Sequence, residues 1–320
     1  MKNTKRLLAL SIASIGLLTT AKADLDPNLP VYQPVSGVSG NLNSIGSDTL
    51  NNLMTLWAES FQAIYPNVHI QIEGKGSSTA PPALIEGTGQ LGPMSRAMKQ
   101  TEIDKFEARF GYKPFQIGVS LDALAVYVHK DNPIKGMSLK QLDSIFSSTL
   151  KFGGDPIETW GQLGMEDSWA PRSISIYGRN SASGTYGFFK SVALGKGDFK
   201  SSVKEQPGSS AVVQGVSSDI YGIGYSGIGY RTSGVRVLPI SSDDGDLYEP
   251  TAENCISGDY PLARLLYIYI NRNPVEDLDT LTKEFLKFVL SKQGQEIVVK
   301  DGYYPLPAEI AEQYIDALEN

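Results

Sequence analysis

The sequence has few of the residues on which many enzymes and metalloproteins depend. Its 320 residues include one cysteine, Cys255, and two histidines, His69 and His129. A single cysteine excludes an intramolecular disulfide. The histidines stand far apart in the sequence and the cysteine has no partner at recognisable spacing, which argues against a two-histidine zinc site or a Cys–His pair. We therefore expect no metal and no cofactor, and we predict that the protein is not an enzyme.

Long apolar runs are also scarce. The longest, Leu7 to Leu18, is shorter than the ~20 residues that a transmembrane helix needs. A basic head from Lys2 to Arg6 precedes it, and the small residues Ala21 and Ala23 follow it as a cleavage site would. This order predicts a secretory signal peptide over residues 1–23, with a membrane anchor as the alternative.

Positive charge is in deficit, with 28 Lys and Arg against 35 Asp and Glu. Cleavage after Ala23 would remove four basic residues and no acidic one, leaving a net charge near −11. Such an acidic protein is not expected to bind nucleic acid or an anionic membrane. Binding of a small anion is not excluded, because it depends on local hydrogen-bond donors. No cysteine stands at the predicted cleavage site to carry a lipid. We predict a soluble periplasmic protein, with outright secretion as the lesser alternative.

The most informative stretch that is present runs from Arg179 to Thr185, Arg-Asn-Ser-Ala-Ser-Gly-Thr, and leads into apolar residues typical of a helix. Ser183 suits a helix N-cap and Gly184 lets another backbone approach closely, so free N–H groups and the positive end of the helix dipole can face an anion. Arg179 adds a charged fork that matches a tetrahedral oxyanion. The alternative is an ordinary capped helix beside a surface ion pair.

Two further Gly- and Ser-rich turns have a similar setting. One contains Ser47 and Asp48, either of which suits the cap of the apolar-striped helix expected after it. The other contains Ser77 and Ser78, follows the strand-like residues 68–72, and precedes two prolines that suit the first turn of a helix. If the three helix starts converge, their hydroxyls and amides form a pocket for one small anion.

Taken in order, these motifs resemble those of the substrate-binding protein of the phosphate ABC transporter, a PstS-like class II periplasmic binding protein. The shared motifs are Gly46-Ser-Asp-Thr49, Gly74-Lys-Gly-Ser-Ser-Thr79, Leu91-Gly-Pro-Met-Ser-Arg96 and Arg179-Asn-Ser-Ala-Ser-Gly-Thr185. The resemblance implies an α/β fold of two lobes, each a mainly parallel sheet flanked by helices, joined by two hinge strands. It also implies a monomeric receptor that binds inorganic phosphate between the lobes and delivers it to inner-membrane ABC permease subunits.

Two continuous apolar runs, residues 121–128 and 265–270, are the expected hinge strands. The predicted parts of the mature chain are an N-terminal arm (24–40), a discontinuous first domain (41–120 plus 261–320) and an inserted second domain (121–260). This division places Ser47 and Ser77 on one lobe and Arg179 on the other. A ligand held by both lobes would favour the closed state.

The resemblance assigns phosphate binding to a set of residues from both lobes. They are Ser47, Asp48, Ser77, Ser78, Ser95, Arg96, Arg179, Ser183, Gly184 and Thr185. One position departs from the family, because Arg96 stands where well-studied relatives have an aspartate that accepts the proton of phosphate. Such a carboxylate rejects sulfate, which has no proton to give. Asp48 and Asp122 are the candidate replacements, and Arg96 is expected to line the cleft, turn to solvent or pair with an acid.

Two other functions stay open. The Arg96 departure allows a receptor for another oxyanion, such as sulfate or arsenate. A phosphatase on the same fold would use Ser183 or Ser77 as its nucleophile. No base lies at recognisable spacing from either serine and no metal motif is visible, which favours the receptor.

Overall fold

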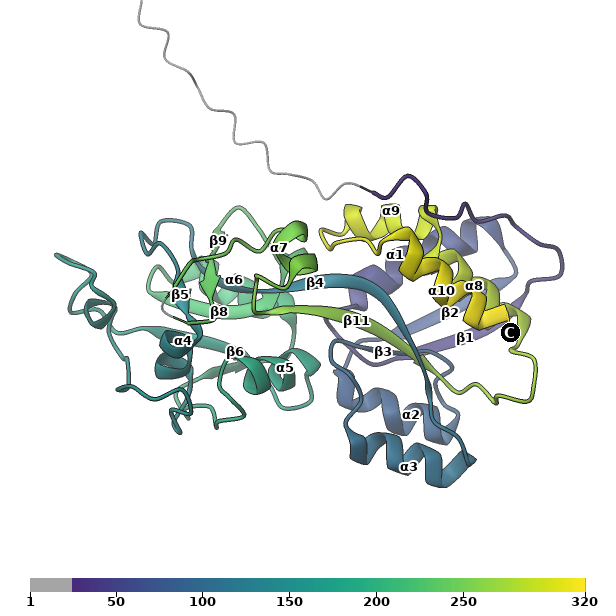
Figure 1. Cartoon of the computed structure of the whole chain (residues 1–320), viewed down its shortest axis with the longest axis horizontal. Coiled ribbons are helices and arrows are strands. Elements are labelled where there is room, and N and C mark those ends of the chain that lie inside the picture. Colours follow the sequence, from purple (N-terminus) through teal and green to yellow (C-terminus); the bar gives the residue numbers. More distant parts are fainter. Residues whose placement is uncertain (1–24, 244, 320) are drawn as a thin grey trace, which may run out of the picture.

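The computed structural model describes residues 25–243 and 245–319. It forms two lobes joined by two long strands (Figure 1). The predicted signal peptide, residues 1–23, lies outside the described residues. Within the described ranges, no helix is long and apolar enough to cross a membrane.

The predicted arm, residues 24–40, contains no helix and no strand before Gly40 in its described part. Tyr32 holds it against the first lobe, because the Tyr32 hydroxyl lies 2.7 Å from the Tyr65 hydroxyl and donates to the Glu284 carboxylate at 2.9 Å. The arm is therefore packed on the surface of that lobe.

The first lobe contains residues from both ends of the described chain. Its elements are β1 (Gly40–Ile45), α1 (Asn51–Ile64), β2 (Val68–Glu73), the short 3-10 helix η1 (Ser77–Thr79), α2 (Ala80–Glu86), β3 (Gly92–Met94), α3 (Gln100–Phe110), α8 (Thr280–Leu290), α9 (Lys292–Lys300) and α10 (Ala308–Glu319). The rings of Phe61 in α1 and Phe285 in α8 meet edge to face at 5.4 Å. This contact ties the C-terminal helices to the first lobe. The prolines at 81 and 82 lie in the first turn of α2, also as predicted.

The second lobe is built from the middle of the chain. Its elements are β5 (Met137–Ser138), α4 (Leu139–Phe146), η2 (Trp160–Leu163), β6 (Ser175–Arg179), α5 (Gly184–Val192), β7 (Lys204–Gln206), α6 (Ser209–Ser218), β8 (Gly222–Gly227), η3 (Ile228–Tyr230), β9 (Val235–Val237), β10 (Ile240–Ser241) and α7 (Ala252–Ser257). The rings of Phe189 in α5 and Tyr225 in β8 stack at 4.0 Å, which fixes α5 against the sheet.

Two strands pass from one lobe to the other: β4 (Phe115–His129) and β11 (Ala263–Ile270), which contain the predicted hinge runs. They pair antiparallel, with a register shift between Leu266 and Tyr267. The main sheet has the order β3-β11-β4-β8-β6-β7, with β9 also on β4. Each of its antiparallel ladders includes β4 or β11, whereas β1–β2, β6–β7, β6–β8 and β5–β10 are parallel. The mainly parallel lobes are thus linked through two antiparallel strands.

Candidate functional site

The three Gly- and Ser-rich turns meet where the lobes touch. Ser77 and Ser95 come from the first lobe, with their Oγ atoms 3.3 Å apart, and both face the start of α5 in the second. A Cβ added to Gly184 would lie 2.3 Å from Ser77 Oγ and 2.6 Å from Ser95 Oγ. Ser78 donates from its N–H and its hydroxyl to the Ala182 carbonyl at 3.1 and 3.0 Å. The lobes are closed on one another, and Ser78 serves this contact.

Helix α5 begins at the site with its N-terminus toward the first lobe. Ser183 is its N-cap, and Ser183 Oγ accepts from the N–H groups of Thr185 at 3.1 Å and Tyr186 at 3.4 Å, so the predicted cap is confirmed. The first N–H groups of a helix have no intrahelical acceptor, and the dipole adds positive potential there. Thr185 Oγ1 lies 2.8 Å from Thr49 Oγ1 of the opposite lobe. The start of α5 therefore forms one wall of the donor-lined contact between the lobes, which we call the cradle.

Arg179 stands at the end of β6 and is 1% exposed. Its Nη1 donates to Ser209 Oγ at 2.7 Å and pairs with Asp48 Oδ2 at 3.1 Å, and its Nη2 donates to the Pro207 carbonyl. Burial lowers the pKa of Arg179, and the Asp48 carboxylate acts in the opposite direction. Arg179 Nε and Ser47 Oγ are buried with no hydrogen-bond partner. Unpaired buried polar atoms cost about 1–3 kcal/mol each, so an anion that bonds to both would be stabilised here.

Asp48 links the lobes instead of capping a helix. The N-cap of α1 is Leu50, which makes no side-chain cap, so the predicted cap at Ser47 or Asp48 is wrong. The Asp48 carboxylate instead accepts from the N–H and the hydroxyl of Ser209 at 2.7 and 2.8 Å, in addition to its pair with Arg179. The Asp48 carboxylate thus gains three hydrogen-bond donors from the second lobe, which stabilise it more than the single backbone hydrogen bond of a helix cap would.

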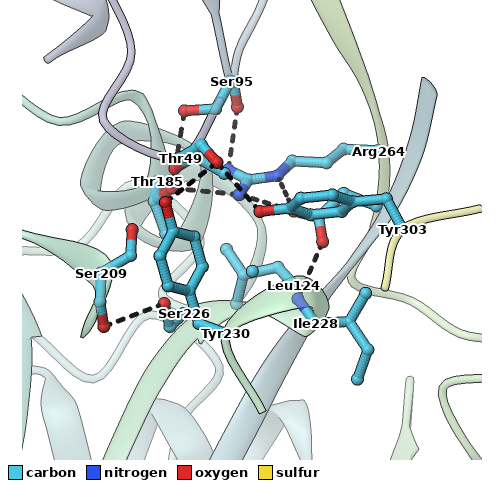
Figure 2. Close-up of polar contacts among 12 residues, drawn as sticks. Thr49, Ser95, Leu124, Thr185, Ser209, Ser226, Ile228, Tyr230, Arg264 and Tyr303 are labelled. Carbon is cyan, nitrogen blue, oxygen red and sulfur yellow. Dashed lines mark hydrogen bonds and ion pairs between the residues drawn. The ribbon is translucent and has the colours of Figure 1, made fainter. Parts of the chain in front are cut away.

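Arg264 of β11 belongs to the site, although the sequence did not single it out (Figure 2). Its Nε and Nη2 bond to Asp122 Oδ2 at 2.9 and 2.7 Å, its Nη1 donates to the Ser95 carbonyl, and its Nη2 also donates to Thr185 Oγ1 at 3.0 Å. The other Asp122 oxygen accepts from the Ile228 N–H at 3.0 Å. Asp122 therefore serves the hinge, which leaves it poorly placed to accept a proton from a ligand.

Replacing Asp122 with asparagine is expected to lower the free energy of unfolding by about 3–5 kcal/mol. The substitution keeps the shape of the side chain but leaves the buried Arg264 guanidinium without its counter-ion. Urea denaturation measures the change. Asp198→Asn is the matched control, because Asp198 pairs with Lys190 in solvent and should change stability little. Equal effects of the two substitutions would contradict a structural role for the buried pair.

Two tyrosine hydroxyls, one from each lobe, hold the Asp48–Thr49 turn, and both lie beside Thr49 in Figure 2. Tyr230 donates to the Asp48 carbonyl at 2.8 Å, and Tyr303 donates to the Thr49 carbonyl at 3.0 Å. Burial raises the pKa of both phenols, so they remain neutral donors at physiological pH. The turn that carries Ser47 is therefore fixed by both lobes.

Arg96 turns away from the cradle. Its Nη1 and Nη2 each lie 2.7 Å from an oxygen of Glu102, which is the pairing with an acid considered above. Ser95 and Arg96 are neighbours in a bend that follows β3. Ser95 reaches the cradle, with its Oγ 3.5 Å from Thr185 Oγ1, whereas the Arg96 guanidinium is held by the Glu102 carboxylate. Its place among the predicted anion ligands is not supported by this geometry.

Comparison with known proteins places this chain among binding proteins. Residues 33–293 match the family model of a PBP superfamily domain. The phosphate-binding protein PstS of Pseudomonas aeruginosa is 54% identical over 321 residues, which cover 99% of each chain. A crystal structure of a protein from Clostridium perfringens with bound phosphate aligns with a TM-score of 0.69 at 26% identity, over 83% of this chain and 100% of that one. An ABC-type phosphate transport receptor from Vibrio cholerae shares the fold, with a TM-score of 0.63 at 23% identity over 83% and 100% of the two chains.

Proposed function

Because this chain belongs to the PBP superfamily, and within it to the PstS phosphate-binding proteins, we propose that it is a receptor for inorganic phosphate. The observation that carries the proposal is the pair of unpartnered buried donors, Arg179 Nε and Ser47 Oγ, one from each lobe. Ser47 is next to Asp48, which pairs with Arg179 across the contact between the lobes. A phosphate there would accept from Arg179, from nearby hydroxyls and from the Gly184 N–H at the helix start.

The site favours the closed state because its ligands come from both lobes. Ser47, Ser77 and Ser95 belong to the first lobe, and Arg179 and Thr185 to the second. A ligand shifts the equilibrium between open and closed forms only by its different affinity for the two. Phosphate would make all these contacts only in the closed form, which is the form that a permease can distinguish from the free receptor.

We propose that a hydroxyl, and not a carboxylate, accepts the proton of bound phosphate. Asp122 is saturated by Arg264 and the Ile228 N–H, and Asp48 Oδ2 takes three donors. The Ser77 and Ser95 hydroxyls lie in the cradle and can accept as well as donate. A hydroxyl can also turn its hydrogen toward sulfate, so discrimination against sulfate should be weaker than a carboxylate would give.

Calorimetric titration of protein freed of ligand by unfolding and refolding tests the function. We expect phosphate to bind with one site per chain near pH 7, and sulfate to bind more weakly but measurably. Absence of sulfate binding would point to a carboxylate acceptor and make Asp48 the residue to replace. Absence of phosphate binding, or steady release of phosphate from a phosphomonoester, would overturn the receptor.

The remaining assignments follow from this function. We propose that the receptor is a monomer in the periplasm, delivers phosphate to the permease subunits of an ABC transporter and catalyses no reaction. Ser183 Oγ supports the last point, because it caps α5 and forms no hydrogen bond to a His, Asp or Glu in the described chain. We also propose that the two domains divide near residues 120 and 260, where β4 and β11 pass between the lobes.

A further inference from the structure

A second cavity lies beside the cradle, at the edge of the contact between the lobes. It has a volume of about 350 Å³. We call it the basic pocket, and the side chains that define it are Arg96, Lys99, Ser183, Tyr186, Lys190 and Lys196. Its residues come from α5 and the segments that flank it, and from the segment between β3 and α3. It adjoins the cradle on both lobes, because Ser183 caps α5 and Arg96 follows Ser95 in the chain.

The basic pocket carries uncompensated positive charge. Arg96 pairs with Glu102 and Lys190 pairs with Asp198, both at 2.7 Å. Lys99 and Lys196 are exposed, and neither has an ion-pair partner within 4.0 Å among the described residues. Two net cations therefore line a cavity on a protein whose overall charge is −7.

The opening lined by α1 and α6 carries no net positive charge. It has a volume of about 640 Å³. Its charged lining residues are Asp48, Asp301 and Arg231, and Asp48 already pairs with Arg179, so one carboxylate and one cation remain. An anion that approaches the interlobe contact is therefore attracted more strongly on the side of α5 than on the side of α6.

We propose that the basic pocket is an outer anion site, the mouth through which phosphate reaches the cradle and which raises its rate of association. The proposal rests on the function proposed above. Both lobes contribute to the pocket, since the position of a Cβ on Gly187 in α5 lies 3.4 Å from Arg96 Cδ. Ser183, the cap of α5, lines both the pocket and the cradle, and the two unpaired lysines are exposed. Charges at the rim of a binding site mainly change the rate constant of association. The rate constant of dissociation depends instead on the contacts that the ligand makes in the cradle.

The double variant Lys99→Gln/Lys196→Gln tests the outer site. Stopped-flow mixing with phosphate, followed by intrinsic protein fluorescence, gives the association and dissociation rate constants. At low ionic strength we expect association to slow roughly fivefold, as Coulomb attraction between a dianion and two cations ~10 Å away predicts after partial screening. Dissociation should change less than twofold, and the difference in association should vanish at high salt.

The control variant is Lys113→Gln/Lys140→Gln, which removes the same charge from exposed positions outside both cavities that flank the cradle. If both double variants slowed association equally, the effect would come from the net charge of the protein, and the proposal of an outer anion site would be wrong. The proposal would also be wrong if Lys99→Gln/Lys196→Gln kept its affinity for phosphate and its association rate constant at low salt equalled that of the unsubstituted protein. If the unsubstituted protein binds no phosphate by calorimetry, the receptor function itself fails, which is a separate result.

Discussion

Replacing Gly184 with alanine is expected to weaken phosphate binding on the order of 100-fold. The added Cβ would lie 2.3 Å from Ser77 Oγ, 2.6 Å from Ser95 Oγ and 2.9 Å from Ser77 Cβ, so rotation of the serine hydroxyls does not remove the clash. Ser77 and Ser95 belong to the opposite lobe, and the overlap therefore arises only on closure. The substitution should oppose the closed state while leaving each lobe folded.

Calorimetry gives the loss of affinity, and small-angle scattering with saturating phosphate reports whether the protein still becomes more compact. Gly187→Ala is the matched control, because it makes the same change one turn later in α5, where the nearest atom, Arg96 Cδ, would be 3.4 Å away. That variant should bind phosphate nearly as well as the parent protein. Wild-type affinity in Gly184→Ala would mean that the ligand-bound form is less tightly closed than this structure.

Replacing Arg179 with methionine is expected to reduce phosphate affinity by a factor of 100 or more, since losing one partner of a buried charged contact typically costs about 2–5 kcal/mol. Arg179 is the one guanidinium of the cradle with a buried, unpartnered nitrogen among the described residues. Its loss also leaves Asp48 facing the ligand without the cation that now pairs with it. Repulsion by this carboxylate would add to the missing attraction.

The double variant Arg179→Met/Asp48→Asn separates the two effects. It should recover part of the affinity if Asp48 repels the ligand in the single variant, and none if only the lost donor matters. Arg109→Met, an exposed site on α3, is the control for net charge and should leave affinity nearly unchanged. A loss of less than fivefold in Arg179→Met would contradict a direct contact between Arg179 and the anion.

Local sequence signals predicted the parts of the site that depend on local structure. Ser183 followed by glycine marks the cap of α5, and the prolines at 81 and 82 mark the start of α2, because backbone geometry favours those residues there. The apolar runs in β4 and β11 identified the crossing strands, since strands buried on both faces lack polar alternation.

The parts that were missed depend on contacts between distant segments. Arg264 and Asp122 are 142 residues apart and lie directly opposite one another in the β4–β11 register. Each is a single charge within an apolar strand, and the two charges have opposite signs. This pattern was the sequence signal from which their pairing could have been predicted. Asp48 fits the local rule for a cap, but its position is decided by donors on the second lobe. Local rules cannot rank such contacts before the fold is known.

The position of β11 has a consequence for how the chain acquires its structure. β11 lies between β3 and β4 in the sheet, yet it begins at residue 263, long after both of them. During synthesis, β6, β7 and β8 can assemble on β4 while β3 and β4 still lack the strand that separates them. The first lobe must therefore finish last, and until β11 arrives these neighbours present unpaired strand edges, which favour association with other chains. The residues of β11, which are synthesised late, thus limit how fast the first lobe can fold. They also determine how long the unpaired strand edges stay exposed to aggregation.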